Sequence, residues 1–228
     1  MKDEIFKKFT KITDDGEKIL VTPFAVSKEK KTAFFHIAKT GGSAIHKILR
    51  EEGYDDGILS NKKLCHEKKL DYFQEVVENW EDYYTFTFIR NKFSQMVSLW
   101  NYDSTNHRNF SAYGKEYQDK ALNDFGFFIK HFVMPSNDLY AYWIDQYYLT
   151  TVDSSVIFDF VGRQEDFKND IEVAMKEIGI KNYNADKRIN DVGYKNKKHF
   201  SKYYDKNIEA LVRKKFKKEI DYFGFSIS

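Results

Sequence analysis

The order of the apolar segments along the chain is the feature that most constrains its fold. Three times, a short run of large apolar residues is followed within a few positions by apolar residues at helical spacing. The apolar runs lie at 33–37, 85–89 and 156–161, and the helical patterns begin near 45, 93 and 167. Strands that alternate with helices are typical of a parallel sheet covered on both faces. We therefore predict an α/β fold with a central parallel sheet of about four or five strands and helices on both faces.

The rest of the chain gives weaker patterns. Residues 1–30 show no clear period and are expected to form an irregular lead-in or an edge hairpin. Helical spacing of apolar residues predicts further helices, at 73–80, 121–132, 136–148 and from 208 onwards. The polar stretch 103–120 has no period and is expected to be an inserted loop. A chain of 228 residues can bury one full core, so we expect residues 1–228 to form a single domain.

Charge and cysteine content exclude several classes of protein. The 37 Lys and Arg residues nearly balance 35 Asp and Glu residues, so no overall field calls for nucleic acid or an anionic membrane. The single cysteine, Cys65, excludes an internal disulfide framework, and no Cys/His cluster has the spacing of a structural zinc site. The N-terminus is charged throughout, and no stretch approaches the roughly 18 apolar residues of a membrane span. We expect a cytoplasmic protein without a metal, a nucleic-acid partner or an integral membrane segment.

The first motif, His36 to Ser43, stands between a predicted strand and a predicted helix and reads HIAKTGGS. Its two glycines allow backbone N–H groups to surround an anion at the start of a helix, where the helix dipole adds about half a positive charge. Lys39 supplies a full charge, and Thr40 and Ser43 can donate hydroxyl hydrogen bonds. The lysine precedes the glycines, so this is not a Walker A loop. The motif predicts a phosphate-binding loop; a tight turn with an incidental lysine is the alternative.

The second motif also lies where a strand runs into a helix. Arg90 follows the apolar run 85–89, and Ser94 and Ser98 share one face of the helix that comes next. An arginine in this place can meet a phosphate at the N-terminal end of that helix. A surface ion pair is the alternative for the arginine.

Taken in order, the two motifs resemble those of the PAPS-dependent carbohydrate sulfotransferases, a sulfotransferase family 2-like group with the signature His-x-Pro-Lys-Thr-Gly-Gly-Thr/Ser. The resemblance extends to 161–165 and 222–225 and so spans about 33–225. It implies a layout like that of P-loop kinases, without their Walker loop. It also implies transfer of a sulfuryl group from 3′-phosphoadenosine-5′-phosphosulfate (PAPS) to a hydroxyl of a carbohydrate or glycoconjugate, with 3′-phosphoadenosine-5′-phosphate (PAP) as the product.

The same resemblance implies roles for particular residues. It assigns the 5′-phosphosulfate to a loop made of Lys39, Thr40, Gly41, Gly42, Ser43 and Ala44, in which Lys39 also stabilises the leaving phosphate. It assigns the 3′-phosphate to Arg90 and Ser98. The loop 103–120 would then lie on the acceptor side, and the basic stretch 182–204, with Lys197 and Lys198, would cover the nucleotide.

The chain departs from the family pattern at several positions. Ala38 replaces the usual proline, Asn91-Lys92 replaces Asp-Pro, and Gln95 stands where a second arginine is common. With one arginine lost, the 3′-phosphate would bind less tightly, or binding would shift onto Lys92 or onto a residue of 195–202.

An alcohol that attacks sulfur must lose its proton, so the reaction needs a base. We expect this base to be His66, which follows the first predicted helix at about the distance seen for a catalytic histidine in related enzymes. Glu67 or another carboxylate would orient the ring, and His36 and His199 are the competing histidines. Two other functions stay open, a phosphotransferase that uses a nucleoside triphosphate with magnesium and a PAPS-binding domain without turnover. The sequence does not determine the oligomeric state.

Overall fold

The computed structural model describes residues 2–12, 18–20, 22–56, 80–106, 115–135, 145–184 and 198–227. The chain divides into two compact units, one formed by 1–89 with 148–192 and the other by 90–147 with 193–228. The expectation of a single domain stays a prediction.

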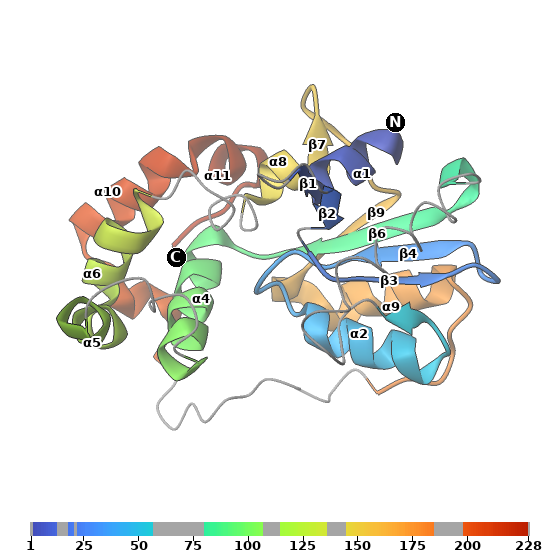
Figure 1. The fold of residues 1–228 in the computed structure, drawn as a ribbon, viewed down its shortest axis with the longest axis horizontal. Coiled ribbons are helices and arrows are strands. Elements are labelled where there is room, and N and C mark those ends of the chain that lie inside the picture. The colour runs from blue at the N-terminus through green and yellow to red at the C-terminus, as the bar shows by residue number, and fades with distance from the viewer. Residues whose placement is uncertain are drawn as a thin grey trace. The chain divides into compact units, whose positions relative to one another are not determined.

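The first unit is built on a five-stranded sheet with the order β5-β3-β4-β6-β9 (Figure 1). Its strands are β3 (Phe24–Ser27), β4 (Thr32–Phe35), β5 (Asp55–Asp56), β6 (Tyr84–Ile89) and β9 (Phe160–Arg163). β4, β6 and β9 are parallel neighbours, whereas β3 runs antiparallel to both β4 and β5. The α/β prediction is confirmed, and the three predicted strands form the parallel part of the sheet.

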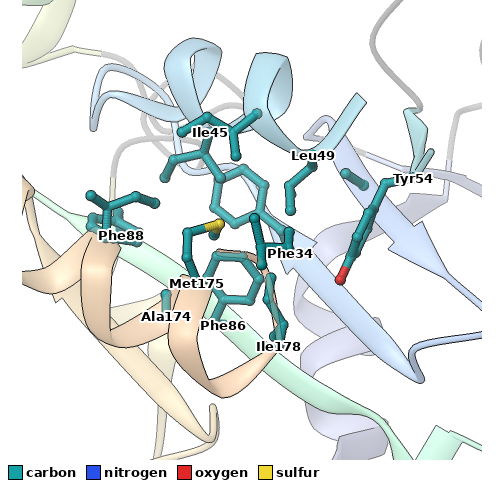
Figure 2. Close-up of a cluster of buried hydrophobic side chains, with 13 residues drawn as sticks. Phe34, Ile45, Leu49, Tyr54, Phe86, Phe88, Ala174, Met175 and Ile178 are labelled. Carbon is teal, nitrogen blue, oxygen red and sulfur yellow. The ribbon is translucent and has the colours of Figure 1, made fainter. Parts of the chain in front are cut away.

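Helices cover both faces of this sheet. α2 (Gly42–Glu51) and α9 (Phe167–Glu177) pack on one face, where Phe34 and Phe86 belong to their shared core (Figure 2). The next residue of β4, Phe35, points the other way and meets Phe9 of α1 (Lys2–Phe9), with ring centroids 4.9 Å apart. Full burial of such a phenylalanine contributes about 2–3 kcal/mol to folding. A strand buried on both faces needs apolar residues at successive positions, which explains the unbroken run in the sequence.

The N-terminal segment is more regular than the sequence predicted. β1 (Thr10–Ile12) and β2 (Lys18–Leu20) pair antiparallel in a two-stranded sheet of their own and not at the edge of the central sheet, and α1 and β3 were not predicted. α1 has eight residues, and its buried positions include Ile5 and Phe9, which is too little to show a helical period.

The third predicted strand, 156–161, is in fact split. β8 (Ser155–Val156) pairs with β7 (Thr151–Val152), and β9 begins only at Phe160. Between them the Asp159 N–H donates to the Thr85 carbonyl at 3.0 Å, while the Asp159 carboxylate accepts from the Thr85 N–H at 2.7 Å. The side chain of Asp159 thus takes a hydrogen bond that a strand residue would have taken with its backbone.

The second unit is helical where it is described. Its helices are α4 (Lys92–Asn106), α5 (Lys115–Asn123), α6 (Phe125–Phe128), the π-helical turn η2 (Ile129–Val133), the 3-10 turn η4 (Phe200–Tyr203), α10 (Lys206–Lys215) and α11 (Lys217–Phe223). α8 (Gln146–Thr150) begins in this unit and ends in the first. The short 3-10 turns η1 (Trp80–Asp82) and η3 (Gln164–Asp166) belong to the first unit.

The prediction of a loop over 103–120 is wrong for the described part of that stretch. α4 continues to Asn106 and α5 starts at Lys115, and 107–114 lie outside the described residues. α5 is rich in good helix formers but its described buried residue is Ala121 alone, so it shows no apolar stripe. An established helix such as α4 also extends through polar residues at little cost, because only nucleation is expensive.

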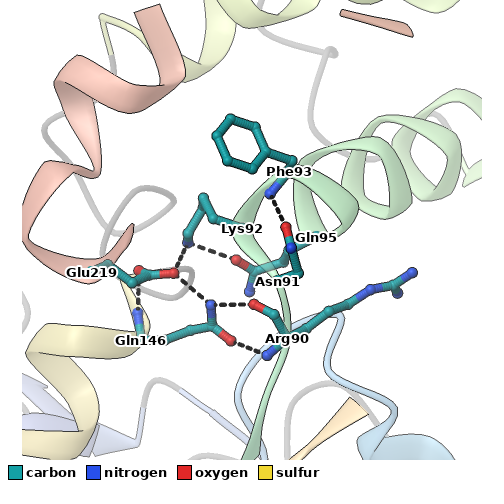
Figure 3. Close-up of polar contacts among 7 residues, drawn as sticks. All are labelled: Arg90, Asn91, Lys92, Phe93, Gln95, Gln146 and Glu219. Carbon is teal, nitrogen blue, oxygen red and sulfur yellow. Dashed lines mark hydrogen bonds and ion pairs between the residues drawn. The ribbon is translucent and has the colours of Figure 1, made fainter. Parts of the chain in front are cut away.

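A buried ion pair organises the start of α4 (Figure 3). Lys92 and Glu219 of α11 are 0% and 1% exposed, and Lys92 Nζ lies 3.0 Å from Glu219 Oε1. Lys92 also donates to Gln95 at 2.6 Å, and Glu219 accepts hydrogen bonds from the backbone and side chain of Gln146. Burial raises the pKa of Glu219 to about 7 against the pull of Lys92, and burial lowers the pKa of Lys92. The network therefore joins α4, α8 and α11 inside this unit.

Replacing Lys92 with methionine should remove the cation that compensates Glu219. Because Glu219 already has a native pKa above its ordinary value of 4.5, the native state holds its proton more tightly than the unfolded chain, and stability falls as pH rises through about 7. Lys92→Met should raise this pKa further and cost about 3–5 kcal/mol of unfolding free energy at pH 8. At pH 5, where Glu219 is protonated in both proteins, the loss should be much smaller. Urea denaturation at pH 8 and at pH 5 measures the two losses of unfolding free energy.

The matched control for Lys92→Met is the double substitution Lys92→Met/Glu219→Gln. It removes both charges, and its amide oxygen can accept one of the two Gln146 hydrogen bonds that Glu219 accepts, so it should recover part of the stability that Lys92→Met loses at pH 8. A Lys92→Met loss that is equal at pH 5 and pH 8 would show that the lysine acts through packing alone.

Candidate functional site

The loop from His36 to Gly41 joins the end of β4 to the start of α2, as the sequence predicted. Two of its residues have left-handed backbone, Lys39 with φ 66° and Gly41 with φ 93°. Such a conformation is uncommon for a residue other than glycine, and it recurs at functional sites. Thr40 is buried, and its hydroxyl donates to the Ile37 carbonyl at 2.8 Å. The Thr40 hydroxyl therefore holds the loop in shape, and its contact with a ligand stays a prediction.

The start of α2 has no side-chain cap in the described part of the chain. Its cap position is Gly41, and its first turn carries no acidic residue. The first turn contains Ser43 and Ala44, both partly exposed. The N–H groups and the dipole at such a helix start attract anions. Together with the charge of Lys39, this arrangement suits a phosphate or phosphosulfate group.

A second strand-to-helix junction adjoins this loop within the first unit. A methyl group built on Gly41 would lie 3.6 Å from Gln164 Cγ and 3.6 Å from a ring carbon of Phe167. These two residues stand just after β9, and Gln164 lies in the stretch 161–165 to which the family resemblance extends. The structure thus brings 36–43 and the region after β9 together.

The ring of His36 packs against the end of the loop, at Gly42. A Cβ at Gly42 would fall 2.1 Å from His36 Cδ2, so only glycine fits at position 42. The His36 ring stacks on Phe34 and lies 5.2 Å, between centroids, from the ring of His46, which is 1% exposed. His36 is therefore part of the packing under the loop, and its candidacy as the base stays a prediction. The contribution of His46 was not predicted, because its partner His36 lies ten residues back in the sequence.

The second predicted anion site lies in the other unit. Arg90 follows β6 directly, its Nε donates to Ser94 Oγ at 2.8 Å, and its side chain points away from the Lys92–Glu219 pair (Figure 3). Ser98 lies one turn after Ser94 on α4 and is partly exposed. The predicted set of an arginine and serines on one helix face is present within this unit.

The structure explains three of the departures from the family pattern. Lys92 is fully buried and ion-paired, so the prediction that it could take over the 3′-phosphate is wrong. Gln95 is buried as well and accepts from Lys92. Asn91 Oδ1 accepts from the Phe93 N–H at 3.0 Å, which is the bond of a helix N-cap, and Nδ2 donates to the Ser226 carbonyl at 2.6 Å. The contacts of these three residues therefore stabilise the second unit.

Several predicted site residues lie outside the described residues, among them His66, Glu67 and Lys197. Lys198 is described and exposed, and next to it His199 Nδ1 lies 2.9 Å from Ser201 Oγ. The roles of all five residues, and the cytoplasmic location, stay predictions.

Two absences can be stated for the described parts of the chain. No three His, Cys, Asp or Glu side chains gather there in a way that could bind a metal ion. In those same parts, every helix is too short or too polar to span a membrane.

Comparison with known proteins adds one finding. The family model described as "Sulfotransferase family" matches residues 22–226, nearly the whole chain. No curated protein and no solved structure is significantly similar to the chain.

The contact between Gly42 and His36 generates a prediction. Gly42→Ala places a methyl group inside the His36 ring, so the loop or the ring must shift, at a cost of about 1–3 kcal/mol of unfolding free energy. The double substitution Gly42→Ala/His36→Ala frees the space and should recover most of the stability lost by Gly42→Ala. Thermal unfolding of the two variants and of His36→Ala gives the comparison. A Gly42→Ala protein as stable as the wild type would show that the ring does not fill this space.

Proposed function

The chain belongs to the Sulfotransferase family, and we propose that it transfers a sulfuryl group from PAPS to a hydroxyl of a carbohydrate or glycoconjugate. Membership of the family supports sulfuryl transfer to a hydroxyl-bearing acceptor in general. The donor, the class of acceptor and the roles of individual residues are our proposal.

The loop before α2 is the observation that carries this proposal. PAPS presents a dianionic phosphosulfate at its 5′ end and a phosphate at its 3′ end, and both need cationic or N–H donors. Lys39, the glycine backbone at 41–42 and the first turn of α2 offer such donors at one helix start. The residues present therefore fit the 5′ end of the donor.

Arg90 and Ser98 are proposed to bind the 3′-phosphate, through the guanidinium fork and the hydroxyl. This assignment is supported by their place after β6 and by the resemblance of the motif, and it rests on no distance to the loop. Lys197 and Lys198 are proposed to cover the nucleotide.

The proposed reaction moves one group between two oxygen atoms. A bond forms from the acceptor oxygen to sulfur while the bond from sulfur to the bridging phosphate oxygen breaks, and PAP departs with that electron pair. His66 takes the acceptor proton as a general base. Lys39 and the N–H groups of the α2 start stabilise the charge that grows on the leaving phosphate, as in an oxyanion hole.

Calorimetric titration with PAP, without metal, tests the donor site. We expect micromolar binding of PAP, and weaker binding of AMP, which is PAP without its 3′-phosphate. ATP with magnesium is the control for the phosphotransferase alternative. A protein that binds ATP with magnesium and does not bind PAP would contradict the proposed function. Tight PAP binding without turnover on any of a panel of sugar acceptors would favour the PAPS-binding domain without activity.

Replacement of two residues separates chemistry from binding. Lys39→Ala should lower kcat by about 10²–10³-fold, because it removes charge stabilisation of the leaving group. His66→Ala should lower kcat by about 10²–10⁴-fold and change the Kd of PAP by less than twofold, because the base does not touch the donor's phosphates. His131→Ala, in η2, is the matched histidine control. If His66→Ala keeps full activity, the base is another residue, with His36 and His199 the next to replace.

A further inference from the structure

Gln146 is a buried glutamine that binds both main-chain groups of Arg90 (Figure 3). The Arg90 N–H donates to Gln146 Oε1 at 2.6 Å, and Gln146 Nε2 donates to the Arg90 carbonyl at 2.8 Å. A side-chain amide thus gives Arg90 the pair of hydrogen bonds that a neighbouring strand would give. We infer that Gln146 is a positioning residue that fixes Arg90 for the 3′-phosphate of the donor. This inference rests on the proposed function and extends it to a residue outside both motifs.

The amide of Gln146 has a single possible orientation. Its Nε2 group donates one hydrogen to the Arg90 carbonyl and the other to Glu219 Oε1, at 2.5 Å. A flipped amide would set its oxygen against both the Glu219 carboxylate and the Arg90 carbonyl, and its NH₂ group against the Arg90 N–H. Three contacts would then become repulsive, and unsatisfied buried groups cost about 1–3 kcal/mol each. The hydrogen bonds of Gln146 therefore fix the backbone geometry at Arg90, in addition to the space that the side chain fills.

Glu219 holds Gln146 in turn. Its second oxygen, Oε2, accepts from the Gln146 backbone N–H at 2.9 Å, and Lys92 compensates its charge. Lys92 is also the second residue after Arg90 in the chain. The buried pair thus fixes Gln146 on one side and the first turn of α4 on the other, and Arg90 lies between these two fixed points.

The side chain of Arg90 is restrained separately, by the bond from Nε to Ser94 Oγ. With backbone and side chain both held, the guanidinium loses less conformational freedom when it binds a phosphate, and such preorganisation strengthens binding. Loosening the backbone should weaken only the contacts that Arg90 makes. In the proposed site these are contacts to the 3′-phosphate, whereas the 5′ end binds to the loop of the other unit.

The test compares PAP with AMP, which differs from PAP only by the missing 3′-phosphate, in calorimetric titrations of the full chain. Gln146→Met keeps the volume and loses the amide, so we expect PAP to bind about tenfold more weakly and AMP to bind within twofold of the wild type. Arg90→Ala should also remove the preference for PAP over AMP. In the double substitution Gln146→Met/Arg90→Ala, the change at Gln146 should have no further effect, because it acts through Arg90.

Tyr204→Phe is the matched control for a merely structural role. The Tyr204 hydroxyl donates to the Phe93 carbonyl at 2.9 Å, so its loss also removes a partly buried hydrogen bond at the start of α4 and lowers stability without touching Arg90. Tyr204→Phe should keep the full preference for PAP over AMP. If Gln146→Met does not fold at the assay temperature, Gln146→Asn, whose shorter amide cannot span both main-chain groups, replaces it with the same expected result.

The outcomes separate the inference from the proposed function. A wild-type protein that binds PAP no better than AMP contradicts the proposed 3′-phosphate site and the inference with it. A wild-type preference for PAP that Gln146→Met retains in full, or a variant that loses PAP and AMP affinity equally, overturns the inference alone. A selective loss of PAP affinity that Tyr204→Phe does not reproduce supports it.

Discussion

The first unit depends on the burial of β4 on both faces. Phe34 and Phe35 are adjacent, point to opposite sides of the sheet and are both fully buried, so two separate packing layers fix the same strand. The chain leaves this strand directly into the loop before α2. A loop that starts from so constrained a strand and ends in a helix packed on the same sheet has little freedom of its own. The left-handed backbone at Lys39 and Gly41 can persist there because the surroundings over-determine it.

The buried pair of Lys92 and Glu219 needs a different explanation, since such pairs rarely add stability relative to apolar residues of the same shape. The burial that raises the pKa of Glu219 to about 7 is evidence of that cost. The charged groups add a directional constraint, because a carboxylate accepts hydrogen bonds in preferred directions. Here both carboxylate oxygens accept from Gln146, and Gln146 in turn holds the backbone of Arg90. The defined backbone geometry at Arg90 offsets the cost of burying the two charges.

The sequence predicted well what local patterns encode. The three parallel strands, the loop at 36–43 and the helices after it all follow from apolar runs, glycines and spacing. It did not predict α1, which is too short for a period, or the split at Asp159, where a side chain replaces a backbone partner. Glu219 and Gln146 were missed for a related reason. Their partners lie 73 and 56 residues away, and a glutamine or glutamate in a charged stretch is typical of exposed surface.

The chain passes from one unit to the other between Ile89 and Arg90, so the two proposed sets of anion ligands belong to units with separate cores. The loop before α2 is held by aromatic packing on the sheet, which includes the rings of Phe34, His36 and His46. Arg90 is held by a network whose central carboxyl has a pKa of about 7. Protonation of Glu219 would remove its charge while Gln146 keeps its bonds to Arg90. The two proposed ligand sets therefore draw their rigidity from different interactions, aromatic packing for the loop and buried hydrogen bonds for Arg90.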